Sequence, residues 1–373
     1  MQPYSEAYFL KDSPYLTYDQ EWARVHGRAN AEKESPDQPG EVTLPTALTL
    51  DDLRQLVRQP VEVFFRARLR VRFDEMTEAQ QELEPFSLNG LENYQIGQSL
   101  LKATDSKRAL TELKLSGSLP MSAFGERESN KLGRELDVVL ERQAIWRDKF
   151  PFESPAISIA LNINGTLVSG TLNGLWSVQD SSKASVNAGS NHALLQMNQR
   201  LGAVLEGSGE DQTARGHIIA GLWVNHLAAC ASGIHLTSTQ LGLDGQVIFE
   251  AMSQANALAI LQELVDAYWE AWKRPLPVAC KTAWAYLQAQ AKAERVALEK
   301  PDKLDKVKDP HEVAQAIFEG GFKRDSELTS SAYLARAFDS YQDIEEELPQ
   351  WAQTLYSAMV SHASLQVQEG ATA

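Results

Sequence analysis

The stretch AISIALNINGTLVSGTLNGLWSV, residues 156–178, contains the clearest fold signal in the sequence. Apolar and polar residues alternate along it, as they do in strands that bury one face. Asn164-Gly165 predicts a tight hairpin, because a type I′ turn needs positive φ at both central residues. The polar run 179–192 is expected to be a loop, and the segment HALLQMNQRLGAVLEG after it is expected to form another strand.

Helical patterns surround this β-rich centre. Thr49 precedes an acidic first turn and is predicted to cap a helix whose leucines recur at helical spacing until Pro60 interrupts it. The run HIIAGLWVNHLAACA is apolar on all sides and predicts a buried helix. Further helices are expected at about 91–104, 126–149, 253–274 and 283–296, and over most of 311–362.

The order of these segments predicts an α/β (α+β) fold, with a mixed central sheet flanked by helices. We expect three parts, namely an extended arm and linker over 1–46, a core domain over 47–275 and a helical C-terminal region over 276–373 that packs on the core. Aromatic residues are frequent in 4–22 and in the later helices, and we assign them mainly to core packing, with subunit docking as the alternative. The tryptophans concerned in the later helices are Trp269, Trp272 and Trp284.

The composition excludes several classes of protein. A formal net charge of -15 argues against a surface that binds nucleic acid everywhere, because lysine and arginine must neutralise the phosphates. Cys230 and Cys280 lie in apolar runs without zinc-ligand spacing and are expected to be buried, reduced thiols. The sequence GSGE at 207–210 lacks the lysine of a phosphate-binding loop. No apolar run reaches the ~20 residues of a membrane helix.

A basic segment follows the first helix. Four of its arginines recur at every second residue, which predicts a strand with one basic face. We regard the arginines of this region as candidate contacts to DNA phosphates. They are Arg54, Arg58, Arg66, Arg68, Arg70 and Arg72. The alternative is an exposed basic face that pairs with nearby acids, namely Asp51, Asp52, Glu62 and Asp74.

Several stretches resemble a known family. LTLDDLRQLVRQPVEVFFRARLRVRF, residues 48–73, resembles the opening helix of RecB/AddB-type PD-(D/E)XK nucleases, with Gln59-Pro60-Val61 where a cysteine motif is usual, so an iron–sulfur cluster is not expected. Stretches that resemble the C-terminal domain of the RecC family cover nearly the whole chain. They are QPYSEAYF, EPFSLNGLENYQIGQSLL, LPMSAFGE and GLWVNHLAACASG. The resemblance implies a degenerate PD-(D/E)XK restriction-endonuclease-like core. Because QPYSEAYF follows Met1 without the basic or flexible lead of a natural N-terminus, we expect a domain excised from a longer protein, with a natural short protein as the alternative.

The resemblance also locates a degenerate active site. Nucleases of this group bind a divalent metal through acidic side chains, because Mg²⁺ prefers oxygen ligands. Gln98 falls at the position of a helical histidine, Asn173 at the aspartate of G-x-x-D, and Gln196 and Asn198 at the aspartate and lysine of D-x-K. Neutral amides do not replace two carboxylates around a cation, so neither a catalytic residue nor a metal site is expected. An ordinary turn residue is the alternative for Asn173.

Among the seven histidines, the close set is His217, His226 and His235. His226 lies in the apolar helix and is expected to be a structural histidine with its polar atoms paired inside the core, rather than a metal ligand.

The resemblance implies a non-catalytic domain of the RecBCD helicase-nuclease, exodeoxyribonuclease V, in recombinational double-strand break repair in the bacterial cytoplasm. The domain would guide and split DNA strands and scaffold RecB-like and RecD-like subunits. It would need no cofactor of its own, because ATP and Mg²⁺ are used by the partners. A strand-separating wedge is expected in the loop 179–192 or at the 164–165 turn, with an ordinary surface loop as the alternative.

Two other functions stay open at this point. In an active metal-dependent nuclease, acids such as Asp180 or Glu206 would have to enter the site. A protein–protein adaptor would make no contact with DNA.

Overall fold

The computed structural model describes residues 45–73, 87–179, 193–299, 301, 306–321 and 325–367. Residues Thr46–Ala373 form one unit, which the following paragraphs describe. Nearly all of the expected N-terminal arm, and the expected loop from residue 180 onward, lie outside the described residues. The first of the two expected positions for a wedge therefore has no structural account.

The predicted hairpin at Asn164-Gly165 is confirmed. Strand β3 (Ile157–Ile163) pairs antiparallel with β4 (Thr166–Leu172). Asn164 has φ +50 and Gly165 has φ +82, the left-handed values that the turn requires. Strand β1 (Ala47–Thr49) adds to β4 in parallel and completes a three-stranded sheet.

A second sheet is mixed and has the strand order β11-β10-β9-β6-β5-β2. Strands β6 and β9 pair in parallel, and every other neighbouring pair is antiparallel. The strands are β2 (Phe152–Ser154), β5 (Leu175–Ser177), β6 (Leu194–Gln199), β9 (Leu236–Leu241), β10 (Gly245–Phe249) and β11 (Ala363–Val367). Strand β6 is the one predicted after the loop. A short ribbon is formed by β7 (Leu205–Glu206) and β8 (Thr213–Ala214).

The predicted helices are all present, and the structure has one further helix, α5, that the sequence did not predict. The helices of the described residues are α2 (Leu50–Arg58), α3 (Pro60–Glu62), α4 (Gly90–Lys102), α5 (Ser106–Leu115), α6 (Ser122–Lys149), α7 (Gly216–Ala231), α8 (Gln254–Lys273), α9 (Cys280–Glu299), α10 (Pro310–Phe318), α11 (Glu327–Ser330), α12 (Ala332–Ala337), α13 (Gln342–Glu345) and α14 (Leu348–His362). The α/β fold with a mixed sheet is therefore confirmed. Within the described ranges, no helix has the length and apolar character that crossing a membrane requires.

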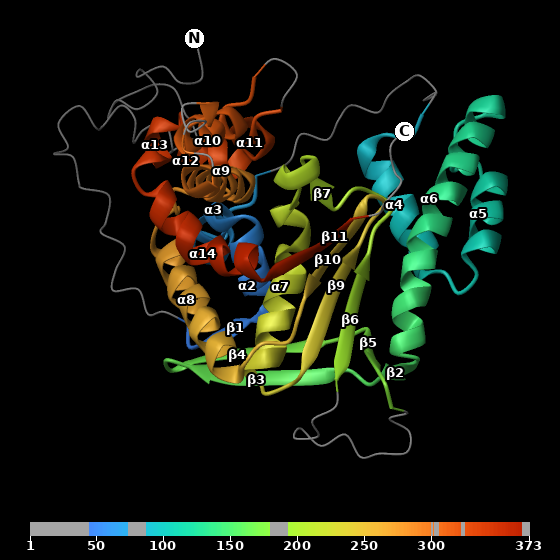
Figure 1. Ribbon diagram of the computed structural model, residues 1–373, viewed down its shortest axis with the longest axis horizontal. Helices are drawn as coiled ribbons and strands as arrows, with labels where there is room; N and C mark the ends of the chain where they lie inside the picture. Colours follow the sequence, from blue (N-terminus) through green and yellow to red (C-terminus); the bar gives the residue numbers. More distant parts are fainter. Residues whose placement is uncertain are drawn as a thin grey trace, which may run out of the picture. The chain divides into compact units, whose positions relative to one another are not determined.

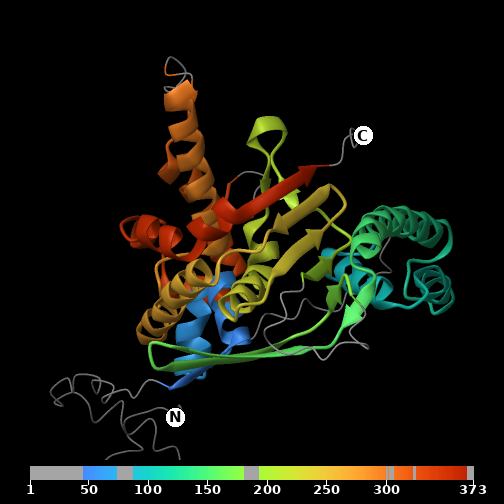
Figure 2. The ribbon, with the colours of Figure 1, turned by 60° about the horizontal axis from the view of Figure 1, so that its bottom comes forward.

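The mixed sheet separates two groups of helices (Figure 1). Helix α7 lies against one face and is backed by α2, α8, α9 and α14, and together they enclose the main hydrophobic core. Helices α4 and α6 lie over the other face, with α5 packed against both of them, and they enclose a second core that includes Leu195 and Leu241 of the strands. The β3–β4 hairpin crosses one end of the unit beside α2 and β1 (Figure 2).

Helix α7 is the centre of the main core. All but three of its sixteen residues are buried, which confirms the prediction of a buried helix. His226 is fully buried, with Nδ1 3.1 Å from Ser238 Oγ and Nε2 3.7 Å from Cys230 Sγ, and its ring stacks on Trp223. Cys230 and Cys280 are both buried and free, as predicted.

The strand predicted for the basic segment is wrong. Residues Val63–Arg68 form a π-helix that continues from α3, and Leu69 N–H donates to the carbonyl of Phe64. The alternation of arginine with apolar residues is short, and the residues before it, 60–63, are all buried, without the alternation of a half-buried strand. Arg70 has φ +55 and lies beyond the end of this helix.

The sequence interpretation also missed strands β9, β10 and β11. The first two form a hairpin whose turn contains Asp244-Gly245, a pair that favours such turns. Strand β11 comes from the C-terminal region expected to be helical, and it adds the outer strand of the mixed sheet beside β10.

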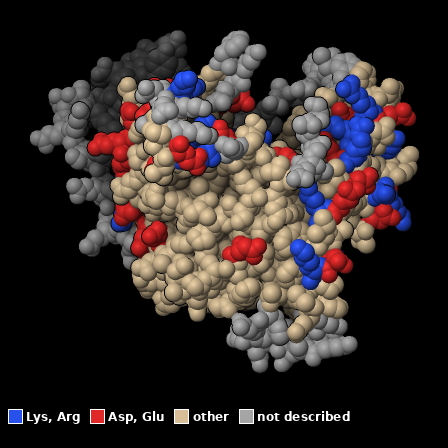
Figure 3. Space-filling view, in the orientation of Figure 1, with Lys and Arg blue, Asp and Glu red and all other residues tan. Residues whose placement is uncertain are grey.

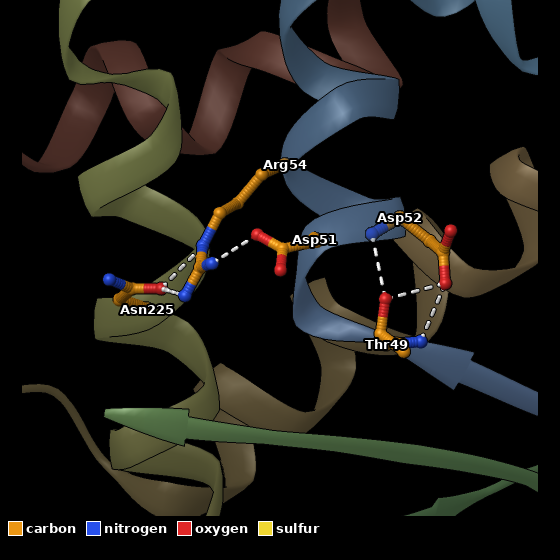
Figure 4. A network of polar contacts seen from close by, with 5 residues as sticks. All are labelled: Thr49, Asp51, Asp52, Arg54 and Asn225. Atoms are coloured by element: carbon orange, nitrogen blue, oxygen red, sulfur yellow. Dashed lines mark hydrogen bonds and ion pairs between the residues drawn. The ribbon is translucent and has the colours of Figure 1, made fainter. Parts of the chain in front are cut away.

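Helix α2 begins at the predicted cap, shown in Figure 4. Thr49 Oγ1 accepts a hydrogen bond from Asp52 N–H at 3.2 Å, and the Asp52 carboxylate accepts from Thr49 N–H at 2.7 Å. Both bonds satisfy amides that have no partner within the helix. One turn later, Arg54 Nε donates to Asn225 Oδ1 of α7 at 2.8 Å and so joins the two helices.

Replacing Thr49→Ala should lower the free energy of unfolding by about 1 kcal/mol, because an amide of the first turn loses its acceptor. Thr49→Ser keeps the hydroxyl and should stay within a few tenths of the wild-type value. Urea unfolding followed by tryptophan fluorescence measures both. Equal stability of the alanine and serine variants would show that the cap contributes nothing.

A second prediction concerns the stability of the fold in acid. Burial, the largest cause, lowers the pKa of His226 to about 4 from 6.5. Between these two pH values His226 is protonated in the unfolded chain but neutral in the folded chain. The contribution of the buried neutral imidazole to stability is therefore complete above pH 6.5 and is lost as the pH falls toward 4. Between pH 7 and pH 5 the wild type should lose about 2 kcal/mol more than His226→Gln. Urea unfolding at both pH values measures these losses. An equal loss of unfolding free energy in the two proteins would contradict the prediction.

Candidate functional site

The structure brings the four amide positions together at one part of the sheet. Asn173 lies in the turn after β4 and is exposed, whereas Gln196 lies in β6 and is 5% exposed. Gln196 Nε2 donates to the main-chain carbonyl of Asn173 at 3.2 Å, while its buried Oε1 has no hydrogen-bond partner among the described residues. The two positions are therefore neighbours.

Gln98 and Asn198 lie at the carboxyl end of the same strand, β6. Gln98 Nε2, from α4, donates at 3.1 Å to the carbonyl of Gln199, the last residue of β6. Gln98 and Asn198 line one pocket, and Gly174, which follows Asn173, lines it as well. This pocket has a volume of about 750 Å³, and we call it the strand-end pocket.

Elements far apart in the sequence form the walls of the strand-end pocket. Helix α4 presents a stripe with helical spacing, namely Tyr94, Gln98, Leu101 and Lys102. The strands β6 and β9 contribute their carboxyl ends. The remaining lining comes from the end of α2, from α6, from β5 and from the first turn of α7, through Arg58, Gln143, Arg147, Trp176, His217 and Ile218.

The lining of the strand-end pocket is basic. It includes four cations and, among the described residues, no aspartate or glutamate. The guanidinium carbon of Arg147 lies 3.5 Å from the centroid of the Trp176 ring, so it covers one face of that ring. Arg200 Nε is buried without a hydrogen-bond partner among the described residues. The four cations are Arg58, Lys102, Arg147 and Arg200.

The positive field acts on the groups within the pocket. Burial, the largest cause, and the nearby positive charges of Lys281 and Arg200 together lower the pKa of His217 to about 4. Burial also lowers the pKa of Arg200, and repulsion from Arg215 adds to this. The carboxylate of Asp244 acts in the opposite direction on Arg200, but it already accepts hydrogen bonds from the main-chain amides of Val204 and Leu205, at 2.8 and 3.0 Å.

Three of the six candidate arginines make internal contacts. Arg54 pairs with Asp51 and Asn225, Arg66 pairs with the buried Glu62 at 2.9 Å, and Arg68 donates to the Lys273 carbonyl and lies over Trp272. The alternative of pairing with nearby acids thus holds for Asp51 and Glu62, whereas Asp74 lies outside the described residues. Arg58 reaches the strand-end pocket, and Arg70 and Arg72 are exposed.

The donors of the strand-end pocket do not suit a divalent metal. Amide oxygens and cations line it where a magnesium site needs carboxylates. Within the described ranges, no group of three or more histidines, cysteines or acids is placed to hold a metal ion. Glu206 lines a different pocket, beside α9, and Asp180 lies outside the described residues. The arrangement favours an anionic ligand over a cation.

The sequence interpretation missed most of the cations of the strand-end pocket. It selected Arg58 but none of Lys102, Arg147 and Arg200. One signal was available, because Tyr94 and Lys102 recur on the same helical face as Gln98. Arg147 and Arg200 reach the pocket only through the packing of α6 and β6.

Comparisons with known proteins agree with this structure. The family model described as "RecC C-terminal domain" matches residues 45–291, more than half of the chain. The RecBCD enzyme subunit RecC of Escherichia coli (strain K12) is 30% identical over 287 residues, which are 76% of this chain and 23% of that protein. The chain thus spans about a quarter of the length of this relative. The match to the family model shows that the chain belongs to the family of RecC C-terminal domains.

Proposed function

We propose that this chain is a non-catalytic RecC-type domain of a RecBCD-type helicase-nuclease that acts in DNA double-strand break repair. It guides and splits DNA strands and scaffolds RecB-like and RecD-like subunits, which carry the ATP-dependent and Mg²⁺-dependent chemistry. The observation that carries the non-catalytic assignment is the pair Asn173 and Gln196, neutral amides joined by a hydrogen bond of 3.2 Å at the two positions where a nuclease of this group has carboxylates.

The positions of these amides support a degenerate PD-(D/E)XK-like core. The G-x-x-D stretch ends at Asn173 beside Gln196, and β6, the strand of the former D-x-K, leads through α7 to the parallel strand β9. Carboxylates here would attract a cation, whereas amides leave most of its dehydration cost unmet. The alternative of an active nuclease is therefore disfavoured by the chemistry of the lining.

The charge distribution supports a role in assembly. Figure 3 shows lysine and arginine gathered over α4, α5 and α6, with acids among them, while the centre of that face carries almost no charge. The cores of protein interfaces are depleted in charged residues, so this central region suits a partner subunit. A pure adaptor has the same neutral face, but it does not account for a basic pocket.

The proposal that no divalent metal binds at the amide positions gives a prediction for thermal stability. Adding 1 mM Mn²⁺ or Mg²⁺ should leave the unfolding midpoint of the wild type unchanged, because only a ligand that binds the folded state raises it. Restoring the acids with Asn173→Asp and Gln196→Asp should lower the midpoint without metal, since Gln196 is buried, and Mn²⁺ should recover it. Differential scanning calorimetry measures both effects.

The matched control is Asn173→Ser with Gln196→Ser, which loses the amides without gaining charge and should not respond to Mn²⁺. A rise of the wild-type midpoint with Mn²⁺, together with cleavage of linear DNA by the wild type, would refute the non-catalytic assignment. Crosslinking of forked DNA to this domain within the assembled complex separates the proposed function from that of an adaptor, which gives no crosslink.

A further inference from the structure

We propose that the strand-end pocket binds single-stranded DNA, with the phosphates on its cations and an unpaired base on Tyr94. The inference rests on the proposed function and deepens it, because it assigns one form of DNA to one set of residues. Four observations carry it, namely the charge of the lining, the unpaired donor of Arg200, the exposed ring of Tyr94 and the place of the pocket in the fold.

The first observation is the concentration of positive charge. The chain has a net charge of -15, yet four separate elements bring Arg58, Lys102, Arg147 and Arg200 to one pocket. No carboxylate of the described residues lines it. Like charges repel, so this arrangement is unfavourable in the empty protein, and a polyanion relieves it. A run of phosphates meets several cations at once, which gives affinity through counterion release.

The second observation is that a donor in this pocket has no acceptor. Arg200 is half-buried, and its Nε has lost water without gaining a partner among the described residues. A buried donor without an acceptor is unfavourable, and a phosphate oxygen is a strong acceptor for guanidinium. The amides of Gln98 and Asn198 can donate or accept beside it, which suits contacts that do not depend on base identity.

The third observation is an aromatic ring left free at the rim. Tyr94 is 52% exposed and lies on the same face of α4 as Gln98 and Lys102. The other aromatic residue of the pocket, Trp176, already has a face covered by Arg147. A free ring beside cations is how sequence-tolerant proteins hold single strands, since every base can stack. Bases inside a duplex are already stacked on each other, so the ring favours a separated strand.

The fourth observation is topological. The pocket lies at the carboxyl ends of the parallel strands β6 and β9 and at the start of the sixteen-residue helix α7. Ligands of α/β sheets bind at such strand ends, and the helix dipole adds positive potential there. This agrees in sign with the four side-chain cations.

The first test measures binding of a fluorescent dT12 oligonucleotide to the full chain by anisotropy as salt is varied. Lys102→Ala with Arg200→Ala should weaken binding roughly tenfold and reduce the slope of log affinity against log salt by about 1.4, since each cation contributes about 0.7 for a single strand. Lys114→Ala with Arg336→Ala removes the same charge from exposed positions outside the pocket and should leave the slope unchanged.

The second test isolates stacking. Tyr94→Ala should weaken dT12 binding about tenfold and leave the salt slope unchanged, whereas Tyr94→Phe, which keeps the ring, should bind as the wild type does. An abasic strand of the same length should bind more weakly than dT12 and be insensitive to Tyr94→Ala. Equal binding of dT12 and the abasic strand would show that the pocket takes phosphate alone and would refute the base contact.

The proposal fails if the wild type does not bind dT12 at low salt, or if the pocket and control double variants weaken binding equally. Preference for a blunt duplex over dT12 would also refute it. The labelled strand is also incubated with the protein and Mg²⁺. This second measurement distinguishes failure of the pocket assignment from failure of the proposed function. Cleavage refutes the non-catalytic assignment, whereas an intact but unbound strand refutes only the assignment of the pocket.

Discussion

Burial of helix α7 is the constraint on which the rest of the structure depends. Its sequence is apolar on every side, so it must be covered on every side, and the mixed sheet, α2, α8, α9 and α14 provide that cover. Because α7 connects β6 to β9, the two strands become parallel neighbours. Their carboxyl ends and the first turn of α7 then meet at one edge. The topology of the fold thus determines where the strand-end pocket lies.

The side chains at that edge have an electrostatic character opposite to that of a metal site. Gln196 is 5% exposed, and its Nε2 donates to the carbonyl of Asn173 while its Oε1 has no partner among the described residues. Burial of a half-satisfied neutral amide costs less than burial of an unpaired charge. An aspartate at the same place would need a cation to offset its desolvation. The neighbouring strand-end pocket is lined by cations from α2, α4, α6 and the residue after β6, so its lining favours an anionic ligand.

Local sequence signals predicted the features that local physics determines. Asn164-Gly165 gave the hairpin, Thr49 gave the cap and the apolar run gave α7. The strand predicted from the alternating arginines was wrong, because four residues of period two are a weak signal beside the helix that begins at Pro60 and continues through Arg68. The strand-end pocket could be predicted only in part, since the resemblance located Gln98 and Asn198, whereas Arg147 and Arg200 reach it through packing between distant elements.

The gathering of cations in the strand-end pocket links the stability of the fold to ligand binding. Burial and neighbouring cations keep His217 neutral and lower the pKa of Arg200, which shows that positive charge in this pocket is already unfavourable. A bound anion offsets this repulsion only in the folded protein, because the cations lie far apart in the unfolded chain. Any ligand that binds only the folded state stabilises it, so a bound strand strengthens the packing of α4 and α6 against the sheet. The proposed binding of DNA at the edge formed by β6, α7 and β9 would therefore stabilise the fold itself.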